Sequence, residues 1–86
     1  MTHEPDATAI HRALLATLRR VCPAPLPDLP SDTPIEALPE LDSLRLVETI
    51  ALLETQFGVT VDTDGLTDLA DLADIAALIR RALPGA

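Results

Sequence analysis

The chain has no lysine, no tryptophan and no tyrosine, and Phe57 is its single aromatic residue. Its core must therefore be built almost wholly from leucine, alanine, isoleucine and valine. A chain of 86 residues forms one domain and buries only roughly 60–65% of the surface of its unfolded state. Such a domain has no room for a deep catalytic cleft, so we expect one small domain over residues 1–86.

Cysteine and long apolar runs are equally scarce. Cys22 is the only cysteine, which excludes an internal disulfide and fits a reducing, cytoplasmic setting. We expect its thiol to be buried or half-buried and structural. No stretch reaches the roughly 18 consecutive apolar residues that a membrane span needs, and residues 1–5 do not resemble a signal peptide. These absences predict a cytoplasmic protein that does not enter a membrane.

Positive charge is also in short supply. Six arginines oppose 14 acidic residues, for a formal net charge of −8, and the stretch from Asp28 to Asp74 contains one basic residue, Arg45. Nucleic acids and anionic membranes both require a basic face, so neither is an expected partner. The acidic charge either favours protein partners with basic docking surfaces, which it would attract from a distance, or only keeps the protein soluble.

The residues that usually carry chemistry are few and scattered. Only His3 and His11 are histidines, and no Cys/His group has the spacing of a metal site. Residues 62–65 begin like a calcium loop but lack the rest of its pattern. A nucleophilic Ser43 would need a base and a group to orient it, and neither is evident. We expect no catalytic residues, no metal ligands and no enzyme activity.

Apolar residues recur at helical spacing in three stretches. They predict helices over about residues 6–20, 43–57 and 71–83. The expected caps are Asp6 and Asp71 at N-termini, with Gly58 as the stop after Phe57. The core-facing residues are expected to be Ile10, Leu14, Leu18 and Val21; Leu46, Ile50, Leu53 and Phe57, widened by Leu44, Val47 and Ala51; and Leu72, Ile75, Ala76, Ile79 and Leu83.

The remaining stretches connect these helices. Residues 22–42 form a long first loop that its prolines make extended, with a helical turn over about 34–38 where Thr33 and Glu36 have the spacing of a capping box. A short third helix is expected over about 64–70. The predicted fold is all-α: a small antiparallel four-helix bundle of three main helices and a short third one, with a long first loop.

Leu41-Asp42-Ser43-Leu44 stands directly before the second predicted helix. Serine and aspartate are both favoured N-caps, so the segment can be a helix cap and nothing more. A serine at a helix N-terminus is also well placed to carry a phosphodiester, because free N–H groups and the helix dipole favour an anion there. These four residues alone leave both readings open.

The neighbouring residues carry a resemblance. Arg45-Leu46-Val47-Glu48 follows the serine, and Glu54-Thr55-Gln56-Phe57-Gly58-Val59 ends the same helix. Together these segments closely resemble the acyl carrier protein family, in which Asp-Ser-Leu opens the second helix and Glu-x-x-Phe-Gly-Ile/Val ends it at this spacing. The resemblance covers roughly residues 34–83 and extends to the first helix in pattern only.

The resemblance implies a function for each part of the segment. Ser43 would be esterified with 4′-phosphopantetheine, taken from coenzyme A by a phosphopantetheinyl transferase, and Asp42 would assist the attachment. The arm's thiol would carry an acyl or aminoacyl group as a thioester. Further partners would be a loading enzyme (an acyltransferase or an adenylating ligase) and downstream synthases with basic docking surfaces. The resemblance implies that they would read Leu44, Arg45, Val47, Glu48 and an exposed Glu54.

Departures from the family pattern narrow the expectation. Glu40, preceded by Pro39, stands where the family often has glycine two residues before the aspartate, and Arg45 stands where many relatives have an acidic or neutral residue. Arg45 either tunes partner choice or is a solvated side chain in the first turn. We expect a free-standing monomeric acyl carrier of a polyketide or mixed polyketide and nonribosomal peptide pathway. An aminoacyl or peptidyl carrier, and a non-carrier acidic adaptor that uses Ser43 only as a cap, remain alternatives.

Overall fold

The computed structural model describes residues 6–22, 26–38, 40–61 and 68–84. These residues form three α-helices and one 3₁₀ turn, and they contain no strand beyond one isolated bridge between Pro34 and Asp71. The elements in chain order are α1 (Ala7–Val21), η1 (Ile35–Ala37), α2 (Ser43–Phe57) and α3 (Leu72–Ala82). None of the helices in these ranges is long and apolar enough to cross a membrane.

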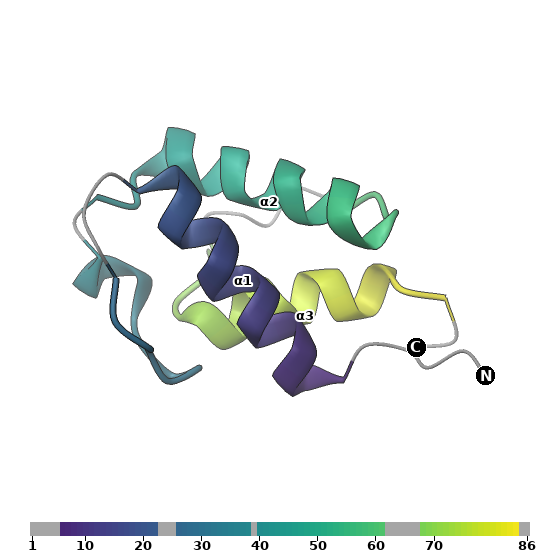
Figure 1. Cartoon of the computed structure of the whole chain (residues 1–86), viewed down its shortest axis with the longest axis horizontal. Coiled ribbons are helices and arrows are strands. Elements are labelled where there is room, and N and C mark those ends of the chain that lie inside the picture. The colour runs from purple at the N-terminus through teal and green to yellow at the C-terminus, as the bar shows by residue number, and fades with distance from the viewer. Residues whose placement is uncertain (1–5, 23–25, 39, 62–67, 85–86) are drawn as a thin grey trace.

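The helix α1 lies across both other helices and packs against each of them (Figure 1). In the same view α2 and α3 run in one direction and α1 runs in the opposite direction. The pairs α1–α2 and α1–α3 are therefore antiparallel, as predicted, whereas α2 and α3 run parallel to each other. Most of the expected short third helix falls on residues 62–67, outside the described residues. Of its described residues, Asp68 has 3₁₀ conformation, whereas Leu69 and Ala70 are not helical. What the structure describes is therefore a three-helix arrangement and not the full four-helix bundle.

The apolar stripes of the three helices meet in one core. The buried side chains are Ile10, Leu14, Leu15, Leu18, Cys22, Leu41, Leu46, Ile50, Leu53, Val61, Leu72, Ile75 and Ile79. Leu44, Val47 and Ala51 were expected to widen the buried face of α2, and that expectation is wrong because all three side chains are exposed. The buried stripe of α2 is the narrower one through Leu46, Ile50 and Leu53.

Two threonines lie inside this apolar core. Thr17 and Thr49 are almost fully buried, and each donates its hydroxyl to the backbone carbonyl four residues earlier on its own helix. Gln56 then donates to the Thr17 hydroxyl across the α1–α2 interface, at 2.8 Å. Each buried hydroxyl therefore has a partner, which removes most of the cost of burying it. Periodicity did not indicate these contacts, because threonine was not counted among the apolar positions.

The long first loop is held to the N-terminus of α3. The backbone N–H groups of Leu72 and Ala73 donate to the carbonyls of Thr33 and Ser31, at 3.1 and 2.8 Å, and the N–H of Ile35 donates to Ala70. Asp71 is the N-cap of α3, as predicted, and forms a capping box with Asp74. The loop thus supplies acceptors that the first turn of a helix needs and cannot provide for itself.

One local prediction for the loop is wrong. Thr33 does not cap the short turn η1, and its hydroxyl donates to the carbonyl of Pro30 at 2.7 Å. The carbonyl of Thr33 is occupied by Leu72. The hydroxyl is therefore used within the loop, and η1 is a three-residue 3₁₀ turn without a side-chain cap.

Two leucines of α2 test this packing. Leu53 is fully buried, whereas Leu44 is 76% exposed. We expect Leu53→Ala to lower the free energy of unfolding by about 2–5 kcal/mol, since it leaves a cavity in the core. Leu44→Ala is the control and should change it by no more than about 0.5 kcal/mol. Urea unfolding followed by helical circular dichroism measures both, and equal losses would contradict the assignment of the buried face.

Candidate functional site

Ser43 is the first residue of α2, and the residue before it caps the helix. The Oδ1 atom of Asp42 accepts a hydrogen bond from the backbone N–H of Arg45, at 2.9 Å. Both residues were possible caps, and the structure assigns the cap to Asp42. Ser43 is exposed, and among the described residues no hydrogen bond engages its hydroxyl. The serine hydroxyl therefore remains available to an external reagent.

The chain that leads to Ser43 is held in place. Leu41 is buried and its N–H donates to the carbonyl of Leu38, which closes the loop just before the helix. On the other side, the guanidinium of Arg45 donates to the carbonyl of Glu40 at 2.9 Å. It also lies 3.8 Å from the Oδ2 atom of Asp42. A hydroxyl at the end of a restrained segment is presented in a defined position.

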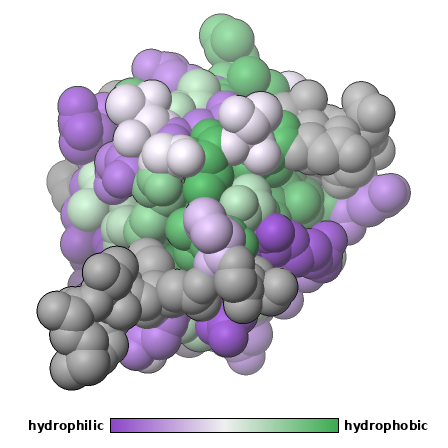
Figure 2. Space-filling view, turned by 90° about the vertical axis from the view of Figure 1, so that its right-hand side faces the viewer, coloured by the Kyte–Doolittle hydropathy of each residue, from purple (hydrophilic) through white to green (hydrophobic). Residues whose placement is uncertain are grey.

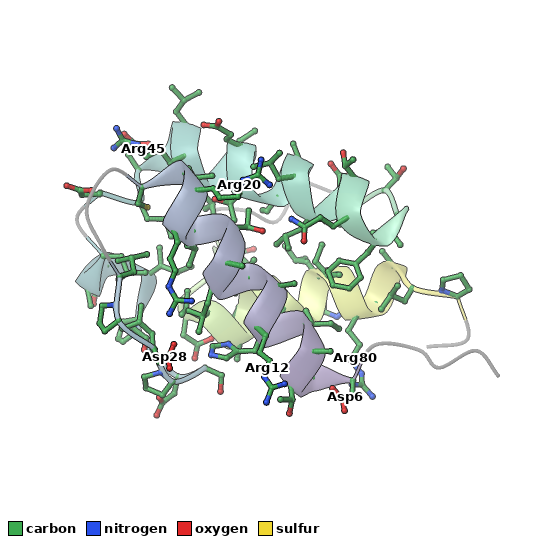
Figure 3. All side chains as sticks on the ribbon, viewed as in Figure 1. Asp6, Arg12, Arg20, Asp28, Arg45 and Arg80 are labelled. Carbon is green, nitrogen blue, oxygen red and sulfur yellow. The ribbon has the colours of Figure 1, made fainter. Side chains whose placement is uncertain are left out.

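One of the two interpretations of Arg45 was a solvated side chain in the first turn of the helix. The structure does not support it, because the Arg45 guanidinium is hydrogen-bonded. Its guanidinium folds back over the segment before Ser43 and bonds to backbone that the sequence pattern did not connect to it. Figure 3 shows it at the start of α2, whereas Arg12 and Arg80 lie on the other side of the molecule. The acceptor is the main-chain carbonyl of residue 40, so it is the Arg45 side chain that provides this restraint on the approach to the serine.

The start of α2 differs from the start of α3 in its free backbone donors. The first two N–H groups of α3 donate to loop carbonyls, whereas those of Ser43 and Leu44 have no partner in the described part of the chain. Free N–H groups at a helix N-terminus, together with the helix dipole, favour an anion. The exposed hydroxyl and these two donors therefore fit a phosphate ester on Ser43.

An apolar and acidic surface continues along the outer side of α2 from Ser43. Leu44 and Val47 are 76% and 48% exposed, and Glu48 beside them is exposed too. Hydrophobic side chains project at the top of Figure 2, the side on which α2 lies. Large apolar side chains that protrude together are more common at protein contacts than elsewhere on a surface. We call Leu44, Val47 and Glu48 the outer face of α2.

Glu54 does not belong to this outer face. It was expected to be an exposed partner residue, and that expectation is wrong because its side chain is half-buried. Its Oε2 atom accepts a hydrogen bond from the N–H of Val61, at 2.7 Å. Gly58 ends α2 in the left-handed conformation, with φ of 65°, and the chain then turns back so that Val61 passes Glu54. Glu54 therefore holds the connector against the helix.

Cys22 is the C-cap of α1 and is buried, as expected for a structural thiol. Burial raises the pKa of this thiol above its usual value, because it disfavours the thiolate. The carboxylate of Glu40 acts in the same direction, and Arg45 opposes it. The thiolate is the reactive form of cysteine, so Cys22 is a poor nucleophile in the folded protein.

Of the two histidines the structure describes His11, and its ring is engaged with the first loop. His3 lies outside the described residues. The Nε2 atom of His11 lies 2.7 Å from the carbonyl of Leu29, in the first loop. Within the described ranges, no group of three or more His, Cys, Asp or Glu side chains is arranged to hold a metal ion. The observed neighbours of Ser43 are a cap, a restrained loop and an outer helix face, which suits attachment.

Alkylation of Cys22 tests its protection. We expect iodoacetamide near neutral pH to modify the folded protein at least tenfold more slowly than the same protein in urea, since both burial and the raised pKa suppress the thiolate. Mass spectrometry over time measures the two rates. An exposed cysteine introduced by Ser31→Cys provides the matched control, because position 31 is exposed and should react rapidly in both conditions. Equal rates at Cys22 would show that it is accessible.

A protein-family model described as Phosphopantetheine attachment site matches residues 12–79, which is most of the chain. The matched stretch begins within α1 and ends within α3, and it includes Ser43 and the outer face of α2. No curated protein and no solved structure matches the chain.

Proposed function

This chain belongs to the family of proteins with a phosphopantetheine attachment site, and on that premise we propose that Ser43 is the residue to which the group is attached. Proteins of this family are carriers that hold 4′-phosphopantetheine covalently and are generally not catalytic. The observation that carries the assignment is the exposed Ser43 hydroxyl beside the Asp42 cap, at a helix end with two free N–H groups. Ser31 is the only other serine in the chain.

Each residue of this segment has a role in the proposal. A phosphopantetheinyl transferase removes the proton of the Ser43 hydroxyl, whose oxygen forms the new bond to the phosphorus that bears the pantetheine arm of coenzyme A. The pyrophosphate P–O bond of coenzyme A breaks in the same step, and adenosine 3′,5′-bisphosphate leaves. The free N–H groups of Ser43 and Leu44 then face the phosphodiester charge. Asp42, with its side chain 59% exposed, remains accessible to the transferase while it caps the helix. When attached, the group supplies a thiol that holds an acyl or aminoacyl unit as a thioester.

Loading with coenzyme A tests the assignment of Ser43. The full chain is incubated with coenzyme A and a phosphopantetheinyl transferase of broad specificity, and its intact mass is measured. We expect the wild type and Ser31→Ala to gain the mass of one phosphopantetheine group and Ser43→Ala to gain none. Gain by Ser43→Ala would refute the assignment. An unchanged mass in the wild type would favour the alternative of an acidic adaptor in which Ser43 is not modified.

We further propose that the outer face of α2 is the docking surface for the transferase, for an enzyme that loads the cargo and for downstream enzymes. Leu44 and Val47 offer apolar contact to a partner, and the negative charge of Glu48 would attract a basic surface on that partner. Arg45 acts in this proposal mainly through Glu40, by restraining the approach to Ser43. It adds one positive charge beside the attachment site.

Two glutamates separate docking from stability. Glu48 is exposed, whereas Glu54 is hydrogen-bonded to the backbone of Val61. We expect Glu48→Ala to raise the KM of the transferase for this protein about two- to tenfold, with stability unchanged. Glu54→Ala should instead lower the free energy of unfolding by about 1–2 kcal/mol, since it leaves the Val61 N–H without its partner. Loading kinetics and urea unfolding measure the two effects, and a Glu48→Ala variant that loads like the wild type would contradict the docking surface.

The remaining features favour a specialised carrier. Pro39-Glu40 replaces a more flexible approach to Ser43, and no glycine pair of the kind common in peptidyl carriers precedes it. We therefore propose an acyl cargo in a polyketide or mixed polyketide and nonribosomal peptide pathway, with an aminoacyl cargo as the alternative. The protein would act in the cytoplasm as a monomer. The mass of the group attached to protein purified from its native host distinguishes the two cargoes.

A further inference from the structure

The guanidinium of Arg45 is held through one of its nitrogens. The Nη1 atom donates to the carbonyl of Glu40 at 2.9 Å, and the same atom lies 3.8 Å from the Oδ2 atom of Asp42. The Nε and Nη2 atoms have no hydrogen-bond partner in the part of the chain that the structure describes. A guanidinium carries its N–H donors in a fixed fork. Arg45 is therefore fixed in place while most of its donors are unused.

The guanidinium lies close to the attachment segment. Arg45 is two residues beyond Ser43, and its side chain reaches back to the carbonyl of residue 40, which precedes the serine. It thereby comes next to the carboxylate of Asp42, the residue directly before Ser43. Consecutive Cα atoms are about 3.8 Å apart, so a phosphate on the neighbouring serine oxygen is within reach of a guanidinium in this position.

The charge of Asp42 makes a cation necessary beside this phosphate. An anion on Ser43 is repelled by a carboxylate on the preceding residue unless that charge is offset. The backbone N–H of Arg45 engages the Oδ1 atom of Asp42, and its guanidinium is the positive group beside Oδ2. Arg45 is also the only basic residue between Asp28 and Asp74. No other side chain of this stretch can supply the positive charge.

We propose that Arg45 binds the phosphodiester of the phosphopantetheine group once this group is attached, an inference that rests on the proposed role of Ser43. The contact uses Nε and Nη2, while Nη1 stays on the carbonyl of Glu40. The free backbone N–H groups of Ser43 and Leu44 supply further donors to the same phosphate. Arginine suits this role because its planar fork matches two phosphate oxygens. Since Nη1 already restrains the side chain, little of its freedom remains to be lost.

The proposed contact differs from the restraint that Arg45 places on residue 40. The restraint is present with and without the attached group, whereas the phosphate contact exists only after attachment. A comparison of the unloaded and the loaded protein therefore separates the two roles. A bound phosphate would also fix the point from which the flexible arm extends.

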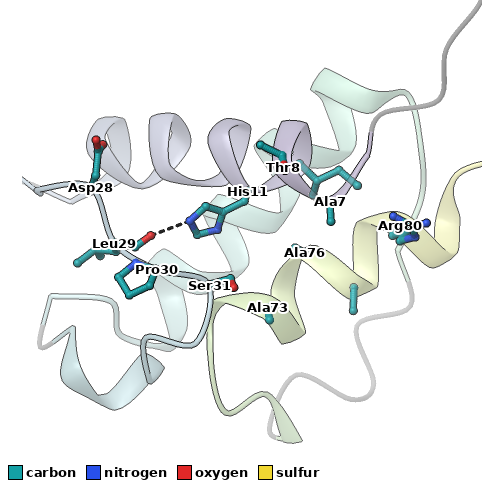
Figure 4. A pocket seen from close by; sticks show the side chains of 12 residues that line it. Ala7, Thr8, His11, Asp28, Leu29, Pro30, Ser31, Ala73, Ala76 and Arg80 are labelled. Carbon is teal, nitrogen blue, oxygen red and sulfur yellow. Dashed lines mark hydrogen bonds between the residues drawn. The ribbon is translucent and has the colours of Figure 1, made fainter.

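Arg80 provides the matched control. It lies in the last turn of α3 and lines a groove between α1 and α3, together with His11 and alanines of α3 (Figure 4). Figure 3 shows Arg80 on the other side of the molecule from Arg45. Arg80→Gln therefore removes the same charge as Arg45→Gln and leaves the attachment segment intact.

NMR of the arginine Nε–H groups tests the proposal on the full wild-type chain, before and after loading with coenzyme A and a phosphopantetheinyl transferase. The signals of Arg45 and Arg80 are assigned by their absence from unloaded Arg45→Gln and Arg80→Gln. We expect the Arg45 signal to shift on loading and its exchange with water to slow about threefold or more, because its Nε–H gains an acceptor. The Arg80 signal should stay unchanged. An Arg45 signal that responds no more than that of Arg80 would overturn the proposal.

Thermal unfolding of the unloaded and loaded forms gives a second measurement. Loading should change the unfolding midpoint of Arg45→Gln about 3–6 °C less favourably than those of the wild type and Arg80→Gln. This difference should shrink in about 1 M NaCl, because salt screens the ion pair. If Arg45 only restrains residue 40, the substitution lowers both midpoints equally, and the proposal is wrong. The NMR measurement needs no loaded variant, so it decides alone if Arg45→Gln loads poorly.

The intact mass of the wild type separates this proposal from the assignment of the attachment site. Absence of a mass gain, or a gain by Ser43→Ala, refutes the assignment and the phosphate contact with it. A gain at Ser43 without a response of the Arg45 signal refutes the phosphate contact alone.

Discussion

The hydrogen bond between the Asp42 carboxylate and the backbone N–H of Arg45 decides what the start of α2 can do. Because Asp42 provides the cap, Ser43 becomes the first helical residue and its hydroxyl is not needed for capping. Had the serine been the cap, its oxygen would have accepted the backbone N–H of Arg45 or Leu46. Because Asp42 caps the helix, the start of α2 is held in place while the hydroxyl of Ser43 has no role in capping.

The helices α2 and α3 differ in how many backbone N–H groups of their first turns are hydrogen-bonded. The first turn of α3 is closed by loop carbonyls and by its own capping box, and nothing further can bind its N–H groups. The first turn of α2 keeps two of its donors open. The long loop therefore does two things at once: it fastens α3 to the fold and delivers the chain to Ser43 through the buried Leu41 and the Glu40–Arg45 contact.

Local patterns predicted much of this protein because they act over a few residues. The spacing of Ile10, Leu14 and Leu18 placed α1, and Gly58 placed the end of α2 at a left-handed turn. Patterns were less reliable where a side chain had two possible uses. Thr33 had the spacing of a cap yet serves the loop, and Glu54 looked like a surface acid yet accepts from Val61. The Thr33 hydroxyl is taken by the Pro30 carbonyl within the loop, and the Glu54 carboxylate by the Val61 N–H of the segment that turns back along α2.

The sequence by itself determined the helices and the motif that resembles a carrier, since these depend on residue type and spacing. Only the tertiary structure decided that Arg45 folds onto Glu40, that Leu44 and Val47 stay outside the core, and that alanines of α3 leave a groove beside His11. Such features depend on which elements meet and at what angle. A periodic pattern predicts which face of a helix is buried. The position of the neighbouring helix decides how wide the buried face is and which polar atoms are buried with it.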